Sequence, residues 1–293
     1  MTDFVGLSLE HVRDWMRSHV RIVPSGVRAV RDLVYVPGGG RRQSLDLYLP
    51  AGSRAAPPIV LWIHGGAWLT GNKEHPPALY LCRRGYAVAA INYRLSREAV
   101  FPAQIMDCRA AVRWLRAHAR MYGADPTRIG VWGVSAGAHL AALLGTANRV
   151  SAWDALGADR QESCAVQAVC DWFGPTDFLQ MGGRHDRPGS PESLLVGGPI
   201  QEHRDRVAAA NPIAYVTDAA PPFLIIHGEK DDLVPLNQSE LLHAALRRAG
   251  VESDLHVIPG AGHGKGVYTD ANMLLVREFM DRHLQRGAQP AGD

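Results

Sequence analysis

Short, almost continuous runs of apolar residues alternate along this chain with segments of helical periodicity, and this alternation restricts the available folds. Strands of this kind are predicted at 59–63, 86–91, 129–132, 166–173, 223–227 and 254–258. Continuous apolar character indicates strands buried on both faces, as in a parallel sheet. Helices are predicted between and after them at 104–121, 138–147, 237–249 and 267–283. The sequence therefore predicts an α/β fold with a doubly wound, mostly parallel sheet.

The N-terminal part has a different pattern. Leu45, Leu47 and Leu49 alternate with other side chains, as in a strand with one face in water. A turn-rich loop, Pro37-Gly38-Gly39-Gly40, separates this strand from another at 30–36. We expect an antiparallel hairpin that opens the sheet, preceded by an amphipathic helix at 7–19.

Residues 178–212 interrupt the alternation with Gly, Pro and charged residues, and with short helical pieces near 192–196 and 202–209. A long irregular segment inside a compact domain is typical of a lid or cap. We interpret residues 1–293 as a single domain, with 1–25 and 178–212 as candidate cap segments.

Composition excludes several classes of protein. Hydrophobic residues make up 46% of the 293, charged residues 20%, and the formal net charge is +2, as in an ordinary globular protein. No basic stripe predicts a nucleic-acid partner, and no apolar run is long enough to span a membrane. The first 20 residues lack the apolar stretch of a signal peptide. We expect a cytoplasmic location with reduced thiols, although Cys164 and Cys170 are close enough in sequence to leave a disulfide open.

The strongest candidate for chemistry is Gly133-Val134-Ser135-Ala136-Gly137, which lies between a predicted strand and a predicted helix. A sharp strand-to-helix turn holds a nucleophilic serine in strained backbone angles, and small neighbours leave room for it. The hydroxyl of Ser135 is then presented at the N-terminus of the helix, where unpaired N–H groups favour negative charge. An ordinary packed turn is the weaker interpretation.

A second motif, His64-Gly65-Gly66-Ala67-Trp68, directly follows the strand at 59–63. Small residues at the end of a strand allow backbone N–H groups to converge on an anion. We interpret this segment as an oxyanion-hole loop.

A serine hydroxyl needs a base to accept its proton and an acid to orient that base. In this fold the order along the chain is serine, acid, histidine. The segment 227–235 offers acids after a predicted strand, and His263 follows the last strand in a glycine-rich loop. Of the 13 histidines, His263 alone has the right order and context. His139 is expected to pack on the nucleophile helix, and surface positions are expected for His19, His75, His118, His185, His203, His243 and His283.

These motifs, in this order, resemble those of α/β-hydrolase esterases of the hormone-sensitive-lipase-like and bacterial feruloyl-esterase-like groups, from about residue 30 to 283. The resemblance implies an eight-stranded sheet and an oxyanion hole formed by the N–H groups of Gly66, Ala67 and Ala136. The family string His-Gly-x-x-Asp-x-x-Val-Pro matches at 227–235 and makes Asp231 the acid. Ala67 departs from the family glycine, which is acceptable only if its φ is not positive.

The resemblance implies a serine carboxylesterase that acts on short-chain or aryl esters through an acyl-enzyme, with catalytic residues Ser135, Asp231 and His263. Neither a metal nor another cofactor is expected, and the partner is a small-molecule ester, with the chain a monomer or homodimer. An amidase or formamidase on the same scaffold, or an inactive binding protein, remains open. Candidate substrate-binding residues are Trp68, Phe178, Leu179 and Val196.

Overall fold

The computed structural model describes residues 23–53 and 55–285. The helix predicted at 7–19, and most of the N-terminal cap segment predicted at 1–25, lie outside the described residues. All side chains predicted to take part in chemistry lie within them.

Eight strands form one sheet, in the spatial order β1-β2-β4-β3-β5-β6-β7-β8. The pairs β1–β2 and β2–β4 are antiparallel, and every other pair is parallel. The predicted mostly parallel sheet and its opening hairpin are therefore confirmed. The strand bounds are β1 (Val27–Val34), β2 (Ser44–Pro50), β3 (Ile59–Ile63), β4 (Ala87–Ile91), β5 (Ile129–Val134), β6 (Ala168–Trp172), β7 (Phe223–Gly228) and β8 (Ser253–Ile258).

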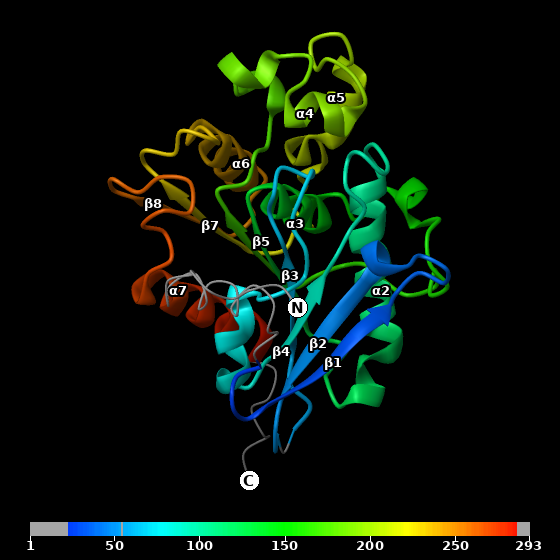
Figure 1. Ribbon diagram of the computed structural model, residues 1–293. Helices are drawn as coiled ribbons and strands as arrows, with labels where there is room; N and C mark the ends of the chain where they lie inside the picture. The colour runs from blue at the N-terminus through cyan, green and yellow to red at the C-terminus, as the bar shows by residue number, and fades with distance from the viewer. Residues whose placement is uncertain (1–22, 54, 286–293) are drawn as a thin grey trace, which may run out of the picture.

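Helices cover both faces of the sheet because its central strands are apolar on both sides. In β3, Ile59, Leu61 and Ile63 point into one hydrophobic cluster, whereas Val60 and Trp62 point into the other. The first cluster packs against helices α2 (Ala103–Tyr122), α3 (Ala136–Thr146) and α6 (Asn237–Arg248). The second packs against the 3₁₀ helix η2 (Pro77–Arg84) and α7 (Asp270–Met280), and Figure 1 shows α2 and α7 on opposite sides of the sheet.

The last helix begins three residues later than the position predicted from its apolar pattern. The side chain of Thr269 accepts a hydrogen bond from the Asn272 N–H at 3.2 Å, which fixes the start of α7 at Asp270. A π-helical turn, η7 (Asp281–Gln285), follows it.

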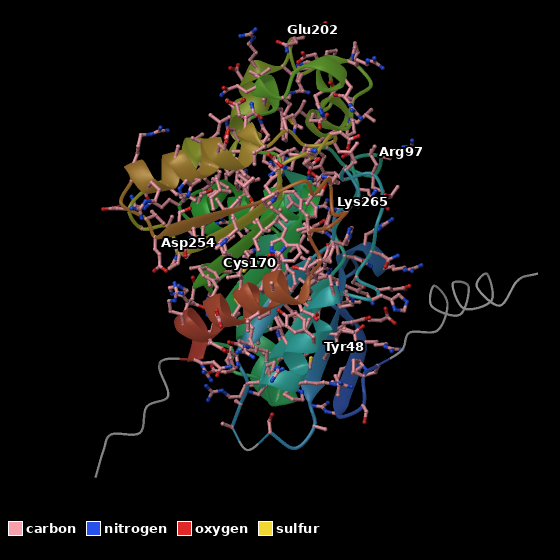
Figure 2. The ribbon with its side chains drawn as sticks, turned by 90° about the vertical axis from the view of Figure 1, so that its left-hand side faces the viewer. Tyr48, Arg97, Cys170, Glu202, Asp254 and Lys265 are labelled. Atoms are coloured by element: carbon pink, nitrogen blue, oxygen red, sulfur yellow. The ribbon has the colours of Figure 1, made fainter. Side chains whose placement is uncertain are left out.

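The segment predicted as a cap is built from short elements: η4 (Phe178–Gln180), η5 (Gly183–Asp186), α4 (Pro191–Val196), α5 (Arg204–Ala210) and η6 (Pro212–Tyr215). Figure 1 shows α4 and α5 together at one end of the molecule, above α3, and in Figure 2 Glu202 marks the outer end of this cap. Buried Leu195 and Val207 belong to the same hydrophobic cluster as α3. The cap is thus continuous with the core.

All four cysteines are free and buried, so Cys164 and Cys170 form no disulfide. No helix within residues 23–53 and 55–285 has both the length and the apolar character needed to cross a bilayer.

Candidate active site

Ser135 occupies the sharp turn between β5 and α3. Its φ of 54° and ψ of −124° lie in a region that residues other than glycine rarely adopt. The flanking glycines make the turn possible because a Cβ on Gly133 would lie 2.1 Å from the Gly137 carbonyl oxygen, and one on Gly137 would lie 2.2 Å from that of Ile63. The turn is therefore crowded by backbone on both sides, which explains the small residues of this motif.

A continuous hydrogen-bonded chain joins Ser135 to His263 and His263 to Asp231. His263 Nε2 lies 3.0 Å from the Ser135 hydroxyl oxygen, and its Nδ1 lies 2.7 Å from Asp231 Oδ2. The carboxylate side chain is fully buried, whereas the histidine side chain is 17% exposed. The adjacent Asp232 is exposed at the surface. The structure thus brings together the three residues predicted from the motifs.

Asp231 is held in place by the loop that follows β7. Its Oδ1 accepts hydrogen bonds from the N–H groups of Leu233 and Val234, at 2.9 and 2.8 Å. Burial alone raises the pKa of this carboxyl, but hydrogen bonds to His227, His263 and Val234 outweigh burial and hold the pKa well below its usual range. The carboxylate therefore stays ionised and faces His263.

His227, on β7, contacts the carboxylate of Asp231. Its Nε2 lies 2.9 Å from the Val234 carbonyl oxygen and 3.4 Å from Asp231 Oδ2, and its Nδ1 lies 2.7 Å from the Ser239 hydroxyl. Nε2–H can donate toward both oxygens when the Ser239 hydroxyl donates to Nδ1. The position of His227, four residues before the acid within one motif, was the available sequence signal for this supporting contact.

The loop that carries His263 packs directly on the end of β7. Lys230 donates its N–H to the Ala261 carbonyl at 2.8 Å, and Glu229 donates its N–H to the Ile258 carbonyl at 3.0 Å. A Cβ on Gly228 would lie 2.5 Å from the Ala261 carbonyl oxygen, so only glycine permits this approach. The ring of Phe173 packs edge-on against His263, with centroids 4.7 Å apart.

The loop after β3 presents backbone N–H groups beside Ser135. The N–H groups of Gly66, Ala67 and Ala136 donate to no partner within the part of the chain described. Ala67 has a φ of 54° and Trp68 a φ of 57°. The condition stated for an alanine at this position, a φ that is not positive, is therefore not met. An alanine adopts this conformation at a cost of about 1 kcal/mol.

A cavity of about 610 Å³ opens above Ser135 and His263. Its lining is largely apolar and includes Leu69, Val134, Phe173, Pro175, Leu233 and Tyr268. Trp68 also lines it, although its side chain is 1% exposed and packs against His139 and Phe178. His139 is buried as expected, with Nε2 2.7 Å from the Ala210 carbonyl.

The other predicted substrate-binding residues do not line this cavity. Phe178 and Val196 are 1% exposed and lie in the main hydrophobic core, and Leu179 packs against that core. Their apolar character, which suggested a pocket, instead anchors the cap to the body of the protein.

Three polar cap residues line the cavity instead: Arg184, His185 and Glu192. The predicted surface position of His185 is wrong, because this residue is only 9% exposed and its Nδ1 lies 2.9 Å from Glu192 Oε1. Charged neighbours in the sequence suggested a surface position. The partner lies seven residues further on and meets His185 only in the folded cap.

Another buried carboxyl, Asp171, lies on β6. Its Oδ1 accepts the Gly174 N–H at 3.0 Å, while its Oδ2 has no hydrogen-bond partner among the residues that the structure describes. Burial raises the pKa of Asp171 to about 6, against the opposing effects of Gly174 and His227. No group of three or more side chains suited to holding a metal ion occurs within residues 23–53 and 55–285.

Comparison with known proteins identifies the family. The BD-FAE family model matches residues 45–246, more than half of the chain. The chain belongs to the BD-FAE family. The members of the BD-FAE family are α/β-hydrolase esterases, as the sequence motifs imply. The matched region contains Ser135 and Asp231.

Curated relatives of this BD-FAE member include esterase LipQ of Mycobacterium tuberculosis (strain ATCC 25618 / H37Rv), 36% identical over 266 residues. That match covers 86% of this chain and 61% of LipQ. The probable carboxylic ester hydrolase LipM of the same organism is 34% identical over 204 residues, with 68% of this chain and 46% of LipM covered. The BD-FAE member thus spans about half to three fifths of these relatives.

Solved structures resemble the BD-FAE member over most of its length. A truncated form of a carbohydrate esterase from gut microbiota has a TM-score of 0.83 and 33% identity, covering 87% of this chain and 95% of that one. Esterase B from Lactobacillus rhamnosis has a TM-score of 0.75 and 25% identity, covering 94% and 92%. Both likenesses support the α/β-hydrolase fold.

Proposed function

We propose that this protein is a serine carboxylesterase with Ser135 as nucleophile, His263 as base and Asp231 as orienting acid. The observation that carries the proposal is the hydrogen-bonded chain of these three side chains, of which Ser135 and His263 line a largely apolar cavity. The names of the relatives, esterases and carboxylic ester hydrolases, support the same chemistry.

The reaction begins when Ser135 Oγ attacks the carbonyl carbon of an ester. His263 Nε2 accepts the hydroxyl proton and then delivers it to the leaving alcohol, so that an acyl-enzyme forms. Water then attacks the acyl group with His263 as base, and the acid is released. Asp231 keeps the proton of the imidazole on Nδ1 and stabilises the imidazolium that forms.

The negative charge that develops on the carbonyl oxygen needs hydrogen-bond donors that are already in place. The N–H groups of Gly66, Ala67 and Ala136, which have no partner among the described residues, are proposed to be these donors, with that of Ala136 at the N-terminus of α3. Donors fixed before the reaction stabilise the transition state without reorganisation, which explains why a strained loop is retained here.

The proposed substrates are small esters with a short acyl chain or an aryl group, which suit a largely apolar cavity of about 610 Å³. The buried, free cysteines support the cytoplasmic location expected from the sequence. An inactive binding protein is disfavoured by the intact contacts among the three polar side chains, and nothing in the cavity favours an amide over an ester.

The test is labelling with a fluorophosphonate, together with hydrolysis of p-nitrophenyl butyrate. We expect the native chain to be labelled and Ser135→Ala to lose both labelling and, by at least about 10⁴-fold, kcat. Ser151→Ala, at an exposed serine outside the cavity, is the matched control and should retain both. An unlabelled native chain, or a labelled Ser135→Ala, would contradict the proposal.

A further inference from the structure

The cap contributes one paired set of titratable side chains to the cavity, separate from the residues proposed for catalysis. His185 Nδ1 lies 2.9 Å from Glu192 Oε1, and the two side chains are 11% and 4% exposed. Within the described part of the chain, Glu192 Oε2 has no hydrogen-bond partner. Burying a carboxylate with a single side-chain partner is costly, so this pair is a poor device for stability alone. Its place in the cavity wall suggests a role in binding.

The second ring nitrogen of His185 is free to meet a ligand. Nε2 makes no hydrogen bond within residues 23–53 and 55–285, and it is not one of the buried, solvent-inaccessible polar atoms. It therefore keeps accessible surface, and His185 lines the cavity that contains Ser135 and His263. Glu192 holds Nδ1–H and so leaves the Nε2 lone pair available as an acceptor.

Two contacts fix this part of the cap relative to the proposed catalytic residues. Arg184, next to His185, donates to the Asp232 carbonyl oxygen at 2.8 Å and so ties η5 to the loop that holds Asp231. Asn237, at the start of α6, donates to the Gln180 carbonyl at 2.9 Å. The segment that carries His185 is thus hydrogen-bonded to the loop that carries the acid and to the start of α6.

We propose that His185 is a specificity-determining residue whose Nε2 binds a hydroxyl group of the ester substrate, with Glu192 as the positioning residue. This inference rests on the proposed esterase function. A hydroxyl suits the site because it donates to a neutral Nε2 and accepts from a protonated one. In a largely apolar cavity, a buried polar group favours the substrate that pairs with it over an analogue that leaves it unpaired.

The hydroxyl can belong to the acyl or to the alcohol part of the ester, and two matched pairs of substrates separate these sources. The acyl pair is methyl hexanoate and its terminally hydroxylated analogue; the alcohol pair is butyl butyrate and its terminally hydroxylated analogue. For each pair the measured quantity is the ratio of kcat/KM, hydroxylated over plain, in a titration of released acid. We expect a ratio of about ten in the native chain for one pair.

In His185→Phe we expect that ratio to fall to about one. Glu192→Leu should lower the ratio similarly, because the ring loses its partner at Nδ1. Glu192→Gln should retain most of the native ratio, because its amide oxygen still accepts from Nδ1–H. His203→Phe is the matched control, because His203 belongs to the same cap but not to the cavity lining, and its ratio should stay at the native value. Circular dichroism checks that each variant folds.

Several results would overturn the inference. The first is a kcat/KM ratio near one for both substrate pairs in the native chain, a result that needs no variant. The second is an unchanged ratio in folded His185→Phe. The third is a fall of the ratio in His203→Phe equal to that in His185→Phe. Fluorophosphonate labelling keeps these results apart from failure of the proposed function. A native chain that is labelled but does not discriminate loses only the inference about His185, whereas an unlabelled one loses the esterase proposal.

Discussion

The two oxygens of Asp231 have different tasks. Oδ1 accepts the N–H groups of Leu233 and Val234, which fixes the carboxylate, while Oδ2 faces His263 and, at a longer distance, His227. The neighbouring Asp232 turns its side chain to solvent, and its carbonyl binds Arg184. A shift of one residue along this loop thus separates a buried acid from an exposed one.

We expect Asp231→Asn to lower kcat by up to about 10⁴-fold, because the amide no longer holds the imidazole in its productive tautomer. Asp232→Asn is the matched control and should change kcat by less than about tenfold. The measurement is kcat on one activated ester, with circular dichroism to confirm folding. Near-normal kcat in a folded Asp231→Asn protein, beside a strong loss in Asp232→Asn, would reverse the assignment.

At the scale of the elements, the segment interpreted from the sequence as a lid or cap, residues 178–212, is anchored in the hydrophobic core. Phe101 donates its N–H to the Leu195 carbonyl at 2.8 Å, and the Leu195 side chain is fully buried in the main core. The adjacent Leu194 is 38% exposed on the same helix, α4. We infer that the cap is a fixed wall of the cavity.

If the cap is fixed, Leu195→Ala should lower the free energy of unfolding by about 2–5 kcal/mol, since it leaves a cavity in the core. Leu194→Ala, one residue away and exposed, should change it by less than about 0.5 kcal/mol. Urea unfolding followed by fluorescence measures both values. Equal, small effects of the two substitutions would indicate instead a lid that opens without disturbing the core.

The strands were predictable because their signal is local. A strand buried on both faces, such as β3 or β7, is continuously apolar, and its ends were predicted to within a few residues. The packing of the cap was not predictable in the same way, because nothing in the local sequence indicates whether Phe178 and Val196 pack in the core or line the cavity. The motifs around Ser135, Gly66 and His263 were recognisable in the sequence because each contains the small residues that an unusual backbone needs. The partner of His185 is set only by the folded chain.

The stability of the whole molecule should depend on pH through Asp171. Burial raises its pKa in the folded protein to about 6, above the value of about 4 in an unfolded chain. The folded state therefore binds this proton more tightly, so its contribution to the free energy of unfolding falls as pH rises from about 4 to about 6. The total change is on the order of 3 kcal/mol.

The side chain of Asp171→Asn cannot ionise, so the variant should not show this fall. As pH rises from about 4 to 7, the free energy of unfolding of the variant should therefore increase relative to that of the native chain. Urea titrations at several pH values measure it. Asp218→Asn, at an exposed carboxyl, is the control and should parallel the native chain. Parallel profiles for Asp171→Asn would show that Asp171 has no such role.

During synthesis the proposed base is the last of these groups to leave the ribosome. His263 follows β8, which pairs with β7 at one edge of the sheet, whereas Ser135 and the loop at Gly66 emerge long before it. A nascent or prematurely stopped chain can hold the serine, the oxyanion loop and even the acid, yet it has nothing to remove the proton from the serine. Unfinished chains in a cell would therefore be inert toward esters.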